Sequence, residues 1–151
     1  MPKIDLTAIA PTNRTGYPAD HAAQVAGRWY RRMAPSGGLT HMGASHVMLK
    51  PGAWSAQRHW HRGEDELVIM LAGEAVLIED GARTVMRAGD VATFPAGVEN
   101  GHHIINESDA DCCFVAVSAG PNAGGFYPDI DMIWDKQDRY LHKDGTPYPG
   151  E

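Results

Sequence analysis

Residues 66–97 read ELVIMLAGEAVLIEDGARTVMRAGDVATFPAG, and this stretch decides the fold. Apolar runs of four to seven residues alternate in it with turn signals, which are Gly73, Asp80-Gly81, Gly89-Asp90 and Pro95-Ala96-Gly97. An Asp-Gly pair between two β-rich runs is the strongest short-range signal for a β-hairpin. The stretch therefore predicts four strands, over residues 66–72, 74–79, 83–87 and 91–94. The first of them is almost entirely apolar, so we expect it to be central, with both faces covered.

The same pattern continues on both sides of this stretch. Four more short runs are predicted to be strands: residues 40–50, 56–61, 101–106 and 112–118. About eight short strands joined by tight turns are typical of a sandwich or barrel. The predicted fold is therefore all-β, an antiparallel double-sheet jelly roll or barrel, because closing the sheets pairs the strand edges.

The two ends of the chain differ from this central part. Residues 1–36 are interrupted by four prolines and are predicted to be an irregular arm, with a short helix at residues 20–26 capped by Asp20. The barrel is expected over residues 37–120. Residues 121–151 are expected to be a C-terminal extension in which a hairpin pairs 131–133 with 140–142.

The N-terminal arm carries three large aromatic residues, Tyr17, Trp29 and Tyr30. A segment so often broken by proline cannot bury them by itself, so they need a surface to cover. That surface is either the outer sheet of the same barrel or a second copy of the chain. We expect a homodimer, because symmetric dimers are the commonest assembly.

Composition excludes several classes of protein. The chain has 13 Lys and Arg against 19 Asp and Glu, a net charge of −6, which argues against a nucleic-acid partner. No apolar run approaches the roughly 18 residues of a membrane span, and no secretory signal is visible at the N-terminus. Cys112 and Cys113 are adjacent and would point to opposite strand faces, so we expect free thiols in a reducing compartment. A cytoplasmic location is therefore expected.

Two histidines near the middle of the chain have the spacing of a metal site. On a strand over residues 56–61, His59 and His61 share one face, with Gln57 beside them. Two imidazoles on one pleated face can reach one ion, at about 2.0–2.1 Å each. Glu66 begins the next strand and could add a carboxylate. The alternatives are a solvated turn at residues 64–66, and for Gln57 an ordinary structural hydrogen bond rather than a contact behind the ligands or with substrate.

A second histidine pair lies at His102 and His103. On a strand over residues 101–106, His102 shares a face with Asn106, and His103 lies on the other face. One of the two must therefore point inward, either as a ligand or as a buried, hydrogen-bonded histidine.

Taken together, the two segments resemble the motifs of the cupin superfamily. The first cupin motif is G-(x)5-H-x-H-(x)3–4-E-(x)6-G, which is matched, with one extra residue after the first glycine, by Gly52, His59, His61, Glu66 and Gly73. The second motif is G-(x)5-P-x-G-(x)2-H-(x)3-N, which is matched, with two extra residues before the histidine, by Gly89, Pro95, Gly97, His102 and Asn106.

The resemblance implies a small single-domain bacterial cupin of the conserved-barrel type, with a metal site. It assigns the ligand roles to His59, His61, Glu66 and His102, with His103 as the alternative fourth ligand. The implied cofactor is one divalent transition metal ion, and Fe, Mn, Ni, Zn and Cu all accept this set.

Cupins include many kinds of enzyme as well as binding proteins, so the resemblance leaves the reaction open. We expect a small metalloenzyme that acts on a small polar or chelating molecule, as a dioxygenase or as a metal-assisted lyase, isomerase or hydrolase. The alternative is a non-catalytic cupin that binds or senses a small ligand. No acid or base outside the ligand set stands out in the sequence.

Overall fold

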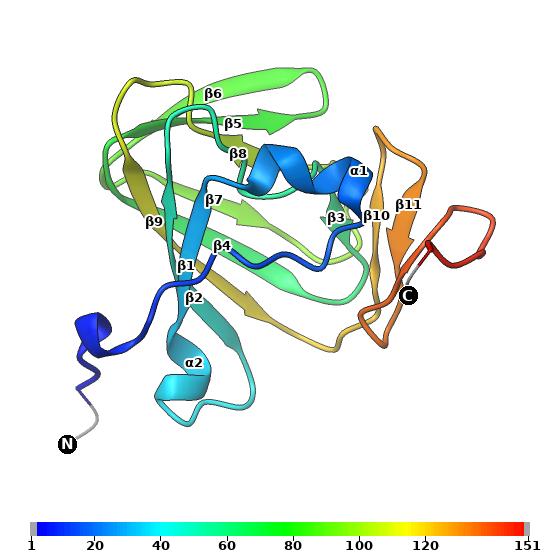
Figure 1. Ribbon diagram of the computed structural model, residues 1–151, viewed down its shortest axis with the longest axis horizontal. Coiled ribbons are helices and arrows are strands. Elements are labelled where there is room, and N and C mark those ends of the chain that lie inside the picture. The colour runs from blue at the N-terminus through cyan, green and yellow to red at the C-terminus, as the bar shows by residue number, and fades with distance from the viewer. Residues whose placement is uncertain (1–2, 150–151) are drawn as a thin grey trace.

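The computed structural model describes residues 3–149, and within them strands dominate over a few short helices. All pairings between the strands are antiparallel, and the strands form two facing sheets with a third, smaller sheet at one end (Figure 1). The predicted all-β jelly-roll barrel is therefore confirmed.

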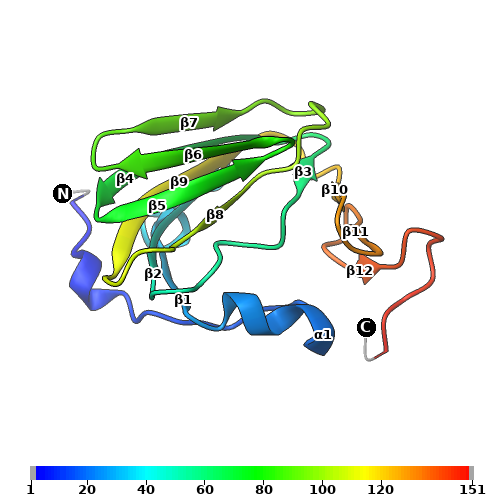
Figure 2. The ribbon, with the colours of Figure 1, turned by 90° about the horizontal axis from the view of Figure 1, so that it is seen from above.

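The largest sheet has five strands. Their order is β1 (Arg28–Arg32), β2 (Gly43–Leu49), β9 (Cys112–Ala119), β4 (Asp65–Ala72) and β7 (Val91–Phe94). The facing sheet has the order β6 (Ala82–Arg87), β5 (Glu74–Glu79) and β8 (His103–Ile105). The third sheet has the order β12 (Tyr140–Leu141), β11 (Met132–Trp134), β10 (Gly125–Tyr127) and β3 (Trp60–His61). Figure 2 shows β10, β11 and β12 grouped at the end of the barrel where β3 lies.

The Asp80-Gly81 pair forms the predicted hairpin turn. Glu79 pairs with Ala82, so the two residues between them close the β5–β6 hairpin. Gly81 has a φ of +70°, a left-handed conformation that glycine adopts without steric cost. The late hairpin is also confirmed, since Ile133 pairs with Leu141 in β11 and β12.

Side chains from the two facing sheets form the core. The residues buried in it include Val47, Leu49, Val68, Met70, Leu77, Ile104 and Phe114. The expectation that both faces of residues 66–72 are covered is wrong in part. Strand β4 is paired on both edges, but the side chain of Leu71 is 46% exposed.

The N-terminal arm is more regular than its prolines suggest. Strand β1 pairs with β2 along its whole length, from Arg28 opposite Leu49 to Arg32 opposite Ser45. Its sequence, RWYRR, lacks the alternation that marks a half-buried strand, so it becomes a strand through its pairing with β2. The arm thus covers its own barrel, the first of the two surfaces considered for it, and the expected homodimer stays a prediction.

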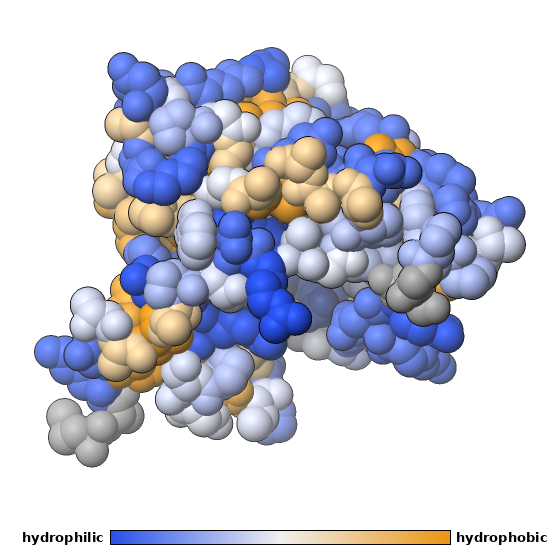
Figure 3. Space-filling view, viewed as in Figure 1, coloured by the Kyte–Doolittle hydropathy of each residue, from blue (hydrophilic) through white to orange (hydrophobic). Residues whose placement is uncertain are grey.

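The helices of the arm also differ from expectation. The predicted helix at 20–26 is split into α1 (Ala19–Ala22) and the 3₁₀ turn η2 (Ala23–Val25), and Pro18, not Asp20, occupies the N-cap position. Two further short elements are η1 (Leu6–Ala8) and α2 (Met33–Ser36). Figure 3 shows a mostly hydrophilic face, with apolar side chains gathered near this arm. No helix in residues 3–149 has the length and apolarity needed to cross a membrane.

Two predicted strands are shorter than expected where they approach each other. The strand expected at 56–61 is reduced to β3, because the backbone bends at residues 55–58. The strand expected at 101–106 is reduced to β8. An isolated bridge still joins His59 to His102, with backbone N–H to O distances of 3.1 and 2.8 Å. This bridge places a histidine of each motif side by side.

Candidate metal centre

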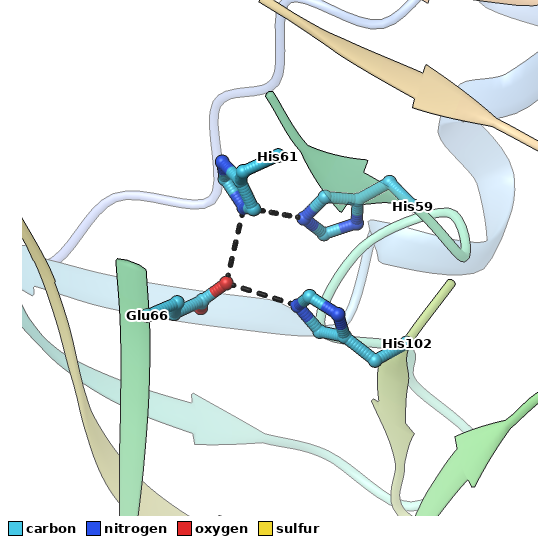
Figure 4. A group of neighbouring side chains, drawn as sticks. All are labelled: His59, His61, Glu66 and His102. Atoms are coloured by element: carbon cyan, nitrogen blue, oxygen red, sulfur yellow. Dashed lines mark hydrogen bonds and ion pairs between the residues drawn. The ribbon is translucent and has the colours of Figure 1, made fainter. Parts of the chain in front are cut away.

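Four side chains converge at this point, three of them from residues 59–66 and the fourth from His102. His59 precedes β3, His61 ends it, Glu66 lies in β4, and His102 directly precedes β8 (Figure 4). Each offers one nitrogen or oxygen atom, and these four atoms all lie within 4.8 Å of one another. The solvated turn considered for residues 64–66 is therefore wrong for Glu66, whose side chain points into the protein and is only 18% exposed.

The distances between the donor atoms are short. His59 Nε2 lies 3.1 Å from His61 Nε2. Glu66 Oε2 lies 3.1 Å from His61 Nε2 and 3.0 Å from His102 Nε2. Three imidazole nitrogens and one carboxylate oxygen thus face a common centre, the donor set that divalent transition metals accept. The residues present fit such an ion.

The electrostatics of the cluster are those of closely coupled groups. Burial lowers the pKa of His59 to about 3, and the neighbouring His102 adds to the effect. Burial also lowers the pKa of His61, but the carboxylates of Glu64 and Glu66 outweigh it and raise the pKa to about 9. Burial would raise the pKa of Glu66, yet hydrogen bonds from His102 and His61 hold it well below its usual range. Glu66 is therefore a carboxylate that balances positive charge at this centre.

Neighbouring groups orient the imidazoles. His59 Nδ1 lies 2.8 Å from the Gln57 carbonyl oxygen, so Nδ1 carries the proton and donates it to this oxygen. Nε2 is therefore unprotonated, and its lone pair can bind a metal ion. The Phe94 ring stacks on His102, with 3.6 Å between the ring centroids. The indole of Trp134 meets His59 and His61 edge-on, at 5.6 and 5.2 Å. The hydrogen bond and these two ring contacts therefore restrict the rotamers of the three histidines.

His103, the alternative fourth ligand, lies outside the cluster of four. Its Nδ1 is 2.9 Å from the Ala56 carbonyl oxygen, and its ring meets Trp54 edge-on at 4.7 Å. It is a buried, hydrogen-bonded histidine, and the structure brings His102 to the centre instead.

The side chain of Gln57 does not face the donor cluster, which corrects the expectation that it lies beside the ligands. Its Nε2 donates to the His21 carbonyl at 2.9 Å and to Gln24 Oε1 at 3.1 Å. The reason is the bend at residues 55–58, which breaks the alternation that would align Gln57 with His59. Only its backbone carbonyl, through His59 Nδ1, supports the centre.

The donor cluster lines a cavity of about 440 Å³. Four aromatic residues from the two ends of the chain form part of its wall: Tyr17, Tyr127, Trp134 and Tyr140. The hydroxyls of Tyr17 and Tyr127 lie 3.3 Å apart. This wall was not predicted from the sequence, because no local pattern in residues 121–151 indicates which distant surface they cover.

Glu64 is a second residue that the sequence analysis missed. It lines the cavity, and its Oε2 lies 3.6 Å from His61 Nδ1, on the side of the ring away from the donor cluster. It is therefore a carboxylate beside the centre that does not belong to the group of four.

Comparison with known proteins identifies the class that this barrel and centre define. The Cupin domain family, Cupin_2, matches residues 45–118. A crystal structure of a sugar phosphate isomerase from a cupin superfamily of Silicibacter pomeroyi is 36% identical. The match covers 98% of this chain and 97% of that one, with a TM-score of 0.90. The chain belongs to the cupin superfamily.

Two further relatives are more distant. An oxalate-binding protein of Thermotoga maritima is 37% identical over 71 residues, which are 47% of this chain and 56% of that protein. The match thus spans little more than half the length of this relative. A polyketide cyclase of Streptomyces resistomycificus covers 86% of the chain and 87% of its own, with a TM-score of 0.68. At 16% identity it shows the shared fold alone.

Proposed function

We propose that this protein is a metal-dependent enzyme that isomerises a small, chelating hydroxy-carbonyl compound of the sugar phosphate class. The observation that carries the proposal is the convergence of four donor atoms within 4.8 Å at the wall of a cavity of about 440 Å³. The similarity to the Silicibacter pomeroyi isomerase over nearly the whole chain supports the reaction class.

The ion would be held by His59, His61, Glu66 and His102. When bound, it supplies Lewis acidity to the hydroxyl and carbonyl oxygens of a chelating substrate. The remaining work falls to the protein. The aromatic wall of Tyr17, Tyr127 and Trp134 excludes water from the cavity and confines the substrate.

Isomerisation of a hydroxy-carbonyl compound needs a base that removes a proton from carbon and returns it to the neighbouring carbon. Glu64 is the group that the geometry offers for this task. Its carboxylate lines the cavity beside the donor cluster, and its side chain is 27% exposed. In the proposed reaction, a carboxylate oxygen of Glu64 takes the proton from one carbon and delivers it to the next, while the hydroxyl proton passes to the former carbonyl oxygen.

The test combines metal analysis with a turnover assay. Natively purified protein is expected to contain about one divalent transition metal ion per chain. Turnover of a panel of aldose and ketose phosphates in D₂O is then followed by NMR, which detects both the product and exchange of the carbon-bound proton. Turnover that persists after complete chelation would remove the metal from the mechanism.

The variant Glu64→Gln tests the base. We expect it to retain its metal and to lose turnover by about 100-fold or more, the usual contribution of a general base. Glu99→Gln is the matched control, since Glu99 is exposed and outside the cavity. Equal turnover in both variants would exclude Glu64 as the base.

A second candidate is a non-catalytic cupin that binds a small chelating ligand. The similarity to the oxalate-binding protein of Thermotoga maritima favours it. Calorimetric titration of the metal-loaded protein with oxalate separates the two functions. Tight oxalate binding without turnover of any compound in the panel would favour the binding protein.

A further inference from the structure

Among the described residues of the cavity wall, one cationic side chain, that of Arg28, has no carboxylate within ion-pair distance. Arg28 begins β1, and its guanidinium lies on the same sheet face as Tyr30 and Val47, which also line the cavity. Its Nη1 donates to the Ser55 carbonyl at 2.7 Å, and Cζ lies 5.3 Å from the centre of the Tyr30 ring. Within residues 3–149, its buried Nε has no acceptor, and no carboxylate lies within ion-pair distance of the guanidinium.

Other charged groups near the cavity are matched within the protein. Arg58 donates through Nε and Nη2 to the two carboxylate oxygens of Asp129, at 2.7 and 2.6 Å. On the cavity wall, Asp138 accepts from Asn122 at 2.8 Å, and Glu64 lies beside His61. Arg28 differs from them because its only recorded acceptor is a neutral backbone carbonyl, while its Nε donates to no acceptor among the described residues. A partly buried charge without a partner costs stability, so it indicates a ligand that supplies one.

Arg28 and the donor cluster line the same cavity, and the charges of Arg28 and Glu66 both act on Tyr17. Burial raises the pKa of the Tyr17 phenol, the positive charge of Arg28 opposes the rise, and the negative charge of Glu66 adds to it. Tyr17 is thus within electrostatic reach of both. A molecule that fills the cavity can therefore touch Arg28 with one end and the donor cluster with the other.

We propose that Arg28 forms an anion subsite, which binds a phosphate or carboxylate group of a substrate whose chelating oxygens lie at the donor cluster. This deepens the proposed function and rests on it for the chelating end. A guanidinium suits the task because its planar fork can donate two parallel hydrogen bonds to an oxyanion. A cavity of about 440 Å³ has room for a small molecule that carries both groups.

Arg31 provides a matched control on the same strand. Its side chain lies on the opposite face of β1, and its Nε donates to the Ile9 carbonyl at 2.9 Å, much as Arg28 donates to Ser55. Arg28→Gln and Arg31→Gln therefore remove the same charge from the same strand, and each loses one bond to a backbone carbonyl. Only Arg28→Gln removes charge from the cavity.

The experiment measures anion binding by calorimetry, in metal-loaded and metal-stripped protein. Inorganic phosphate and acetate are the first probes, and their relative affinities show whether phosphate or carboxylate is preferred. Arg28→Gln is expected to weaken binding of the preferred anion by about 10-fold or more, the usual loss for a charge-assisted hydrogen bond. Arg31→Gln is expected to bind as the unmodified protein does. Equal binding in the two variants, or no binding of either anion to the unmodified protein, would overturn the proposal.

A second pair of probes, fructose 6-phosphate and fructose, differs only in the phosphate. The unmodified protein is expected to bind the phosphate ester at least about 10-fold more tightly, and this preference is expected to vanish in Arg28→Gln. Arg28→Lys keeps the charge without the fork, so an intermediate preference supports the proposal if Arg28→Gln fails to fold. A preference unchanged in Arg28→Lys and Arg28→Gln alike would contradict it.

The metal-stripped protein separates this inference from the proposed function. Anion binding that depends on Arg28 and persists without metal supports the subsite even if no turnover is found. Anion binding that disappears on chelation and is the same in Arg28→Gln would assign the anion to the metal and refute the subsite.

Discussion

The side chain of Asn106 makes a set of hydrogen bonds whose loss has a calculable cost. Its Nδ2 donates to the carbonyls of Leu49 and Ala110, at 2.9 and 2.8 Å. Its Oδ1 accepts from the backbone N–H and the hydroxyl of Ser108, at 3.0 and 2.7 Å. The residue is completely buried. Asn106 thus joins the end of β2 to the loop that follows β8, and it does so without touching the donor cluster.

Replacement by alanine removes all four bonds. At about 1 kcal/mol for each, with buried backbone groups left unpaired, Asn106→Ala is expected to lower the free energy of unfolding by about 3–5 kcal/mol. Asn106→Asp keeps an acceptor for Ser108 but places a carboxyl oxygen against two carbonyl oxygens. Because burial raises the pKa of that carboxyl in the folded state, the protein binds more protons folded than unfolded, and acidification should recover part of the lost stability.

Urea unfolding followed by tryptophan fluorescence measures both effects. Asn122→Ala is the control, because Asn122 is exposed and, of its three hydrogen bonds, two lie at the surface and one, from the Gly124 N–H, is only partly buried. It should cost well under half as much as Asn106→Ala. Metal content of folded Asn106→Ala protein should equal that of the unmodified protein. A loss below about 1 kcal/mol for Asn106→Ala would refute the additive estimate.

Three further predictions concern the metal centre, the thiols and the assembly. His102→Ala should remove most of the bound metal while His103→Ala retains it, as elemental analysis of the purified variants will show; the reverse result would exchange their roles. Burial raises the pKa of Cys112 to about 11, so the partly exposed Cys113 should be alkylated first, and peptide mass spectrometry that finds Cys112 labelled earlier would contradict this. Light scattering should give the mass of a homodimer, and the mass of one chain at micromolar concentration would exclude it.

Local pattern predicted the central part of the fold well. The runs at 74–79 and 91–94 are strands with the predicted bounds, because alternation and a tight turn are properties of neighbouring residues. The strand at Arg28–Arg32 could not be found in this way. Its side chains carry no alternation, and it exists because β2, the next strand along the chain, offers an edge to pair with.

The four donor residues of the candidate metal centre were predictable from the sequence, but the residues around them were not. The H-x-H spacing and the position of Glu66 indicated three of the four donors, and spacing to Asn106 selected His102 over His103. The side chain of Gln57 was misplaced because strand alternation was extended into a segment that bends. Glu64 gave no signal, since a carboxylate in an acidic turn has the same sequence pattern whether it faces solvent or a cavity.

Several residues of the cavity wall lie outside the two cupin motifs. The family motifs supply the donor cluster, which many different reactions can use. Tyr17 and Arg28 come from the N-terminal arm, and Tyr127 and Trp134 come from the C-terminal extension. These residues form part of the cavity wall beside the donor cluster, and Arg28 adds a positive charge to it. Substrate choice in this protein is therefore expected to follow its two terminal segments, while the ability to hold a metal follows the barrel.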